Sequence, residues 1–182
     1  MKNDIYDNML SAYDLSTEQQ KRNAIFEVNQ QVILAGLYNG GFFDVAAFYG
    51  GTCLRIFHGL QRFSEDMDFS LLVPDGKFDF AKYFQPIIDE FAIVGREVEI
   101  KKKDKKNFGK VESAFLKDNT DVYDISFQTD KSIKIKIEVD TRPPLNFRTE
   151  QKLLLQPHSF MTRCFALPDL FAGKMHALVY RV

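Results

Sequence analysis

Two aspartates spaced by one residue, Asp66 and Asp68, are the side chains of this sequence best suited to hold a metal ion. The segment 66–69 has the pattern of a strand, along which side chains alternate between two faces. Both carboxylates therefore lie on one face, with Cα atoms about 7 Å apart. Two carboxylates so placed repel each other unless a cation lies between them. Mg²⁺ is the cation expected, because it prefers hard oxygen ligands and completes its shell with water and substrate phosphates.

A glycine pair precedes the aspartates and could bind an anion. Gly50 and Gly51 form a predicted turn after a strand over 46–49, and we expect Thr52 to open and cap a short helix. Glycine has no Cβ, so the backbone can approach a ligand closely, and the free N–H groups at a helix N-terminus favour negative charge. The segment is therefore predicted to bind the triphosphate of a nucleotide.

Residues 50–69 together resemble the AbiEii/AbiGii nucleotidyltransferase family, within the DNA polymerase β-like nucleotidyltransferase superfamily. The resemblance is carried by Gly50-Gly51-Thr52-x-Leu54-Arg55 followed by Arg62-x-Ser64-x-Asp66-x-Asp68-Phe69. Either half alone is common in ordinary turns and exposed strands, whereas both halves in this order are specific. The resemblance covers most of the chain, although its specific motif lies only in these residues.

Two further candidates follow from the resemblance. In the superfamily a carboxylate from a neighbouring strand joins the Asp-x-Asp pair, which implies Glu138, with Asp140 as second choice, since both lie on the polar face of a strand predicted over 133–141. The same alternation is found in ordinary half-buried strands. Lys174, in a helix predicted over 167–178, matches the family's lysine and is implied to contact the nucleotide's phosphates or to assist the transfer; an exposed helix lysine needs no such role.

By this resemblance, Asp66, Asp68 and Glu138 hold two Mg²⁺ ions and promote in-line transfer of a nucleotide from an NTP. The expected phosphate contacts come from the glycine turn and the polar side chains near it: Gly50, Gly51, Thr52, Ser64, Arg55 and Arg62. One of the two arginines would add a charge-assisted fork. Arg55 could instead face away from the site and pair with Glu65 or another acid.

The implied function is that of a toxin of a type IV toxin–antitoxin or abortive-infection system, which adds nucleotides to an RNA such as the tRNA acceptor end. A cognate antitoxin encoded nearby, without a stable complex, is implied as well. Two alternatives stay open: a catalytically silent module that binds nucleotide or RNA, and transfer to a hydroxyl of a small molecule or protein. Family members continue past the helix over 167–178 with a further acidic segment, so we expect a shortened or truncated member.

Composition limits the class of protein. The chain has 182 residues, of which 45% are hydrophobic and 18 are Phe, without a long apolar run, and this fits a globular protein with one core and no membrane span. The first residues lack the apolar h-region typical of a signal peptide, and Cys53 and Cys164 are the only cysteines, so we expect a cytoplasmic protein. The net charge of −1 argues against a polyanion-binding surface over the whole protein. The lysine-rich segment 101–106 could contact an RNA backbone or form a solvated hairpin tip.

The order of elements predicts an α+β nucleotidyltransferase fold, with a mixed sheet, helices packed on one side and a preceding N-terminal helix. A capping-box pattern at Ser16-Thr17-Glu18-Gln19 opens that helix, which we expect to end near Tyr38. An amphipathic helix is expected over 79–91. Further strands are predicted over 97–103, 111–117 and 122–127. We divide the chain into an N-terminal helical segment, 1–45, and a nucleotidyltransferase core, 46–182.

Overall fold

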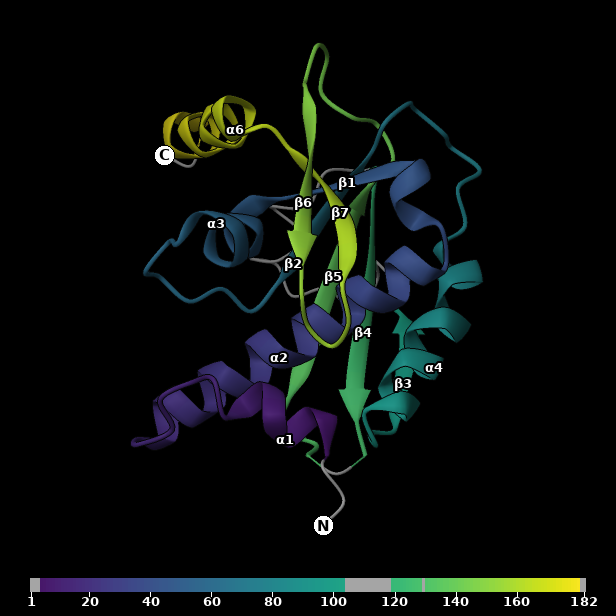
Figure 1. The fold of residues 1–182 in the computed structure, drawn as a ribbon. Helices are drawn as coiled ribbons and strands as arrows, with labels where there is room; N and C mark the ends of the chain where they lie inside the picture. The colour runs from purple at the N-terminus through teal and green to yellow at the C-terminus, as the bar shows by residue number, and fades with distance from the viewer. Residues whose placement is uncertain (1–3, 104–118, 129, 181–182) are drawn as a thin grey trace.

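The fold is built on one mixed sheet, seen in Figure 1. The structure is a computed structural model that describes residues 4–103, 119–128 and 130–180. Its described strands are β1 (Ala46–Tyr49), β2 (Met67–Leu71), β3 (Val98–Lys102), β4 (Thr120–Phe127), β5 (Lys134–Asp140), β6 (Thr149–Leu154) and β7 (Phe160–Phe165). They form a seven-stranded sheet in the order β3-β4-β5-β2-β1-β7-β6. The helices are α1 (Ile5–Leu10), α2 (Glu18–Asn39), α3 (Gly50–His58), α4 (Phe84–Ile93) and α6 (Leu167–Tyr180), with short 3-10 turns η1 (Phe42–Asp44) and η2 (Phe80–Tyr83).

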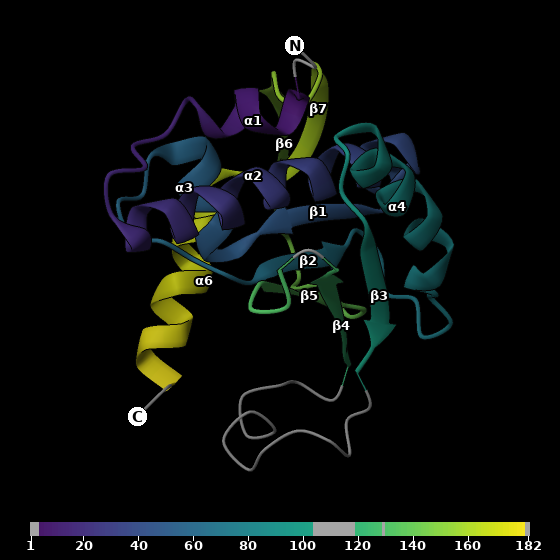
Figure 2. The ribbon, with the colours of Figure 1, turned by 90° about the horizontal axis from the view of Figure 1, so that it is seen from below.

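Helices α2 and α4 lie together on one face of the central strands, with α1 beside α2 (Figure 2). Helix α3 leaves the end of β1, and α6 lies against α3. The predicted α+β class, with a mixed sheet and helices on one side, is confirmed. Helix α2 contributes buried residues to the same hydrophobic core as the sheet, and the division of the chain at residue 45 stays a prediction. Among the helices of the described residues, none is long and apolar enough to cross a membrane.

The central strands have a register that separates the core from a polar face. Asp68 on β2 is the Cα partner of Tyr49 on antiparallel β1 and of Glu138 on parallel β5. Such partners project from the same face of a sheet, so these three side chains form a row across three strands. Phe48 and Phe69, one residue along, point to the opposite face, are completely buried and place their ring centroids 5.0 Å apart. The helices therefore cover the apolar face, and Asp68 and Glu138 lie on the opposite, polar face.

The start of α2 differs by one residue from the predicted capping box. Thr17 is the N-cap, and its hydroxyl accepts the N–H of Gln20 at 3.2 Å, while the Gln20 side chain accepts the N–H of Thr17 at 3.1 Å. The capping box therefore lies at 17–20 instead of 16–19. Ser16 donates its hydroxyl to the Gln20 side chain at 2.9 Å. Its hydroxyl is therefore hydrogen-bonded although Ser16 is not the N-cap.

Several elements differ from the sequence-based expectation. Strands β6 and β7 and the short helix α1 were not predicted. The helix expected over 79–91 is divided into η2 and α4, and the strand expected over 111–117 lies outside the described residues. Strand β6 is an edge strand whose residues are alternately exposed and half-buried. It carries Glu, Gln and Lys on a short run, which gives little hydrophobic signal.

Candidate active site

Two of the three carboxylates predicted to bind metal are linked by a lysine that was not among the predicted site residues. The Nζ atom of Lys136 lies 2.9 Å from Oε1 of Glu138 and 3.2 Å from Oδ2 of Asp66. Asp68, the register partner of Glu138, completes the group. Burial lowers the pKa of the Lys136 ammonium, but its hydrogen bonds and charge interactions with Glu138 and Asp66 outweigh that effect, so this pKa lies above its usual range. The lysine is therefore charged and holds two of the three carboxylates together.

Asp68 is the most perturbed of the three acids. Burial, together with the negative charges of Glu138 and Asp66, raises the pKa of Asp68 to about 7, while Lys136 and Lys174 act in the opposite direction. A carboxylate that is this hard to ionise marks a place where negative charge is insufficiently compensated. An added cation would remove that penalty, which is the behaviour expected of a metal ligand.

Lys174 and Ser64 meet above the second glycine of the turn. A Cβ placed on Gly51 would lie 3.0 Å from Oγ of Ser64 and 3.6 Å from Nζ of Lys174. Lys174 comes from α6 and Ser64 from the loop before β2, so two distant segments place an ammonium and a hydroxyl at one glycine. The other glycine, Gly50, has φ of 81°, and a Cβ there would lie 2.9 Å from Cγ of Asp68. Gly50 is therefore required for this close approach, and a side chain at Gly51 would press on the Ser64 hydroxyl.

The glycine turn belongs to helix α3 itself. The helix begins at Gly50, with Tyr49 as N-cap and no capping side chain, so the expectation that Thr52 opens and caps it is wrong. Thr52 is completely buried and donates its hydroxyl to the main-chain oxygen of Asp66. This bond ties α3 to the segment that carries the carboxylates. The helix N-terminus keeps the uncapped N–H groups on which anion binding depends.

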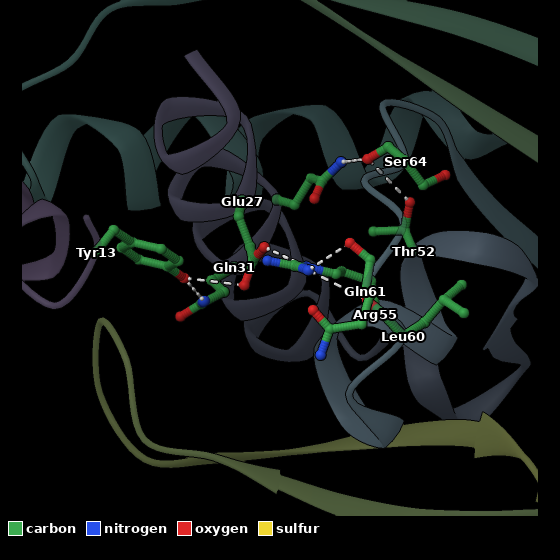
Figure 3. A network of polar contacts seen from close by, with 9 residues as sticks. Tyr13, Glu27, Gln31, Thr52, Arg55, Leu60, Gln61 and Ser64 are labelled. Carbon is green, nitrogen blue, oxygen red and sulfur yellow. Dashed lines mark hydrogen bonds and ion pairs between the residues drawn. The ribbon is translucent and has the colours of Figure 1, made fainter. Parts of the chain in front are cut away.

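Arg55 takes part in a network between α2, α3 and the following loop, shown in Figure 3. Its Nε donates to Glu27 at 2.9 Å, and its Nη1 donates to the main-chain oxygens of Leu60 and Gln61, both at 3.1 Å. The Glu27 side chain is only 13% exposed. Of the alternatives kept open for Arg55, the structure favours pairing with an acid, and that acid is Glu27 instead of Glu65.

Arg62 contrasts with Arg55. It is exposed and has no hydrogen bond or ion pair with any described residue. Gln30 of α2 fixes the adjacent loop by donating its amide to the main-chain oxygens of Ser64, at 2.9 Å, and Glu65, at 3.2 Å. Arg62 is therefore attached to a fixed loop and keeps its guanidinium available for a ligand.

The structure distinguishes between Glu138 and Asp140. Although both lie on one face of β5, Asp140 accepts the side-chain amide of Asn119 at 2.7 Å and the N–H of Arg142 at 2.8 Å. Asp140 is 4% exposed and pairs in register with Ser70, two residues beyond Asp68. The geometry therefore favours Glu138 as the third carboxylate and gives Asp140 the task of ordering the end of the strand.

The lysine-rich segment is only partly described. Lys101 pairs with Glu99 at 3.0 Å, and Lys102 pairs with Asp121 at 3.2 Å. Lys103 donates its N–H to the main-chain oxygen of Val122 at 2.8 Å, and residues 104–106 lie outside the described residues. Contact of this segment with RNA stays a prediction.

Sequence reasoning missed two residues beside the acids. Lys136 stands two residues before Glu138 on an alternating strand, so their shared face was readable from the sequence. Tyr49 lies next to Asp68 in register and stacks on Phe165 at 5.1 Å between ring centroids. Burial, with the nearby carboxylates of Asp68, Asp140 and Glu138, raises the pKa of the Tyr49 phenol, which stays neutral.

The donor set suits a hard divalent cation, with one restriction. Within the described ranges, no three His, Cys, Asp or Glu side chains are grouped so that they could hold a metal ion as they stand. The ammonium of Lys136 lies between Asp66 and Glu138 and pairs with both. Asp66 and Asp68 still offer carboxylate oxygens, and Mg²⁺ is commonly bound by one or two carboxylates together with substrate phosphates. The residues therefore fit a divalent cation that is bound jointly with a nucleotide.

Comparisons with known proteins agree with this chemistry. A family model described as nucleotidyl transferase AbiEii toxin of type IV toxin–antitoxin systems matches residues 32–182. A search among curated protein sequences gave no match.

Solved structures share the fold at low sequence identity. MenT4, a nucleotidyltransferase toxin from Mycobacterium tuberculosis H37Rv, matches with a TM-score of 0.60 and 20% identity over 92% of this chain and 57% of its own. JHP933 from Helicobacter pylori matches with a TM-score of 0.53 and 18% identity, over 88% of this chain and 58% of its own. A putative nucleotidyltransferase from H. pylori matches with a TM-score of 0.51 and 17% identity, over 87% of this chain and 59% of its own. The chain thus spans less than two thirds of the length of these structures.

Proposed function

Because the chain belongs to the AbiEii family of nucleotidyl transferase toxins, we propose that it transfers a nucleotide from an NTP to an RNA acceptor, such as the acceptor end of tRNA. The reaction depends on Mg²⁺. The observation that carries the proposal is the acidic row: Asp68 and Glu138 are register partners on neighbouring strands, Asp66 is linked to Glu138 through Lys136, and the row adjoins the uncapped start of α3.

The phosphates of the NTP are held at the glycine turn in this proposal. The N–H groups at the start of α3 bind phosphate oxygens, and the hydroxyl of Ser64 donates to them. Lys174, whose Nζ lies near Gly51, neutralises negative charge that develops during transfer. Arg62 is the arginine available for a charge-assisted contact, since the contacts of Arg55 lie within the protein.

The carboxylates position the acceptor and receive its proton. Asp66 and Asp68 would hold the divalent cation, which when bound lowers the pKa of the attacking hydroxyl and compensates charge on the phosphates. The hydroxyl proton passes to a carboxylate oxygen of Asp66 or its neighbour Asp68. Asp68 lies against Gly50, so the carboxylate and the phosphate-binding helix start are held close together.

In the cell, we assign this reaction to the cytoplasm, where NTP, Mg²⁺ and tRNA meet. The family description names type IV toxin–antitoxin systems, so the proposed partner in regulation is an antitoxin encoded nearby. No stable complex between the two is required, because a type IV antitoxin need not bind the toxin to oppose it.

The test is incubation of the protein with each labelled NTP, Mg²⁺ and total tRNA. We expect label on RNA and release of pyrophosphate with the wild type, and loss of both with Asp66→Asn and with Glu138→Gln. Glu99→Gln is the matched control, because Glu99 is an exposed strand residue paired only with Lys101. Saturable NTP binding without pyrophosphate release would contradict transfer and support a silent binding module. Label on a small molecule or protein would contradict the RNA acceptor.

A further inference from the structure

The acidic row already contains one bound cation, the ammonium of Lys136. We propose that Lys136 takes the place of the second metal ion, so that the site binds a single divalent cation through Asp66 and Asp68. This inference deepens the proposed function and departs from the two-ion arrangement expected from sequence. Lys136 is a positioning residue here, since it acts on the carboxylates that bind the ion.

The ammonium of Lys136 lies where a second metal ion would bind. In two-ion sites the metals lie about 4 Å apart and share carboxylates. The Nζ of Lys136 contacts both Asp66 and Glu138 at hydrogen-bond distance, at 3.2 and 2.9 Å, and a second ion bridging these two acids would occupy the same space. The ligands of that ion are therefore already engaged.

The lysine is also firmly placed. Its backbone lies within β5, which is hydrogen-bonded to β2 on one side and β4 on the other. The Lys136 side chain is 27% exposed, and Glu138 is 22% exposed, so their ion pair is shielded from solvent and strengthened by the lower dielectric. Asp124, the Cα partner of Lys136 on β4, is the remaining acid that faces this lysine from a neighbouring strand.

The net charge of the site also favours a single divalent cation. Asp66, Asp68 and Glu138 bring three negative charges when ionised, and Lys136 and Lys174 bring two positive charges. The single negative charge that remains is more than neutralised by one divalent cation. A second divalent cation would gain no attraction from the protein's own charges unless the lysine left, and only the triphosphate of the NTP would offset its charge.

The experiment counts Mn²⁺ ions bound to the protein together with a non-hydrolysable NTP analogue, by titration calorimetry and electron paramagnetic resonance. We expect one ion and no spin coupling for the wild type. Lys136→Met, which keeps the length of the side chain and removes the charge, should bind two ions that show the coupled spectrum of a close Mn²⁺ pair. Lys134→Met is the matched control, because Lys134 is an exposed lysine on the same face of β5, and it should behave as the wild type.

Any of three results overturns the inference: a coupled ion pair in the wild type, no bound ion in the wild type, or a single ion in Lys136→Met. Circular dichroism and thermal unfolding establish that the variant is folded, and Lys136→Gln serves as a second charge-removing variant. The outcome is separable from the transfer assay. RNA labelling by a wild type that binds two ions refutes only the lysine's role, whereas one bound ion without any transfer refutes only the proposed function.

Discussion

The motif over 50–69 supplies two polar regions that behave in opposite ways. The network around Arg55 pairs its charge with Glu27 and with main-chain oxygens, between α2, α3 and a loop. In the acidic row the ammonium of Lys136 pairs with Asp66 and Glu138, and Asp68 keeps a pKa of about 7. Buried charges that are paired stabilise a fold, whereas a buried carboxylate with a strongly shifted pKa is typical of a binding or catalytic site. The two regions therefore divide the motif into a scaffold and a site.

The largest expected effect comes from removing an uncompensated charge. Asp68→Asn should lower the rate of nucleotide transfer by about 10³-fold, equivalent to about 4 kcal/mol of transition-state stabilisation. The asparagine keeps the shape of the side chain, so the protein should remain as stable as the wild type or become more stable. Labelled-NTP transfer and thermal unfolding measure the two effects. Asp89→Asn on the exposed face of α4 is the control, and equal rates for both variants would place Asp68 in the scaffold.

The contact between the glycine turn and the site gives the next effect. Gly50→Ala should destabilise the protein by about 3 kcal/mol, because φ is 81° and the new Cβ would collide with the Asp68 carboxylate. Denaturant unfolding measures this difference. Gly76→Ala is the control, since nothing lies within 4 Å of a Cβ there, and its stability should be unchanged. A wild-type stability for Gly50→Ala would mean that the turn is looser than described.

The two arginines sharpen the comparison directly. Arg55→Met should cost about 2 kcal/mol of unfolding free energy, because Glu27 and two main-chain oxygens lose their donor. Its transfer rate per folded molecule should stay within a few-fold of the wild type. Arg62→Met should do the reverse, with unchanged stability and weaker NTP binding. Calorimetry measures the NTP affinity of each variant, and denaturant unfolding measures its stability. If both variants lost stability and NTP affinity alike, the division into a scaffold and a site would be refuted.

A pH dependence of stability tests the acidic row without any substitution. The folded pKa of Asp68, about 7, lies above the value of about 3.9 for an unfolded aspartate, so the folded state binds more protons between these values. The free energy of unfolding should therefore fall as pH rises from about 4 to about 7 in the absence of divalent cations. Asp68→Asn should flatten this slope relative to the wild type, and Mn²⁺ should restore stability above pH 7. Thermal unfolding in a chelator at a series of pH values tests both, and parallel curves for the two proteins would contradict the shift.

Much of the fold was readable because local patterns were strong. The alternation over 133–141 predicted β5 and the shared face of Glu138 and Asp140, and the capping pattern located α2 to within one residue. The hairpin of β6 and β7 was missed. Its edge strand has one exposed face and a polar composition, so only its pairing with β7, and that of β7 with β1, identifies it as part of the sheet.

The sequence by itself determined the residue types of the site and the face of each strand on which they lie, since side-chain alternation and glycine freedom are local properties. Only the tertiary structure decided which side chains meet. The register of β2 with β5 sets Glu138 beside Asp68, the approach of α2 diverts Arg55 to Glu27, and α6 brings Lys174 to Gly51. These contacts join segments far apart in the chain, and the free energy that selects them comes from burying one common core, which no local pattern encodes.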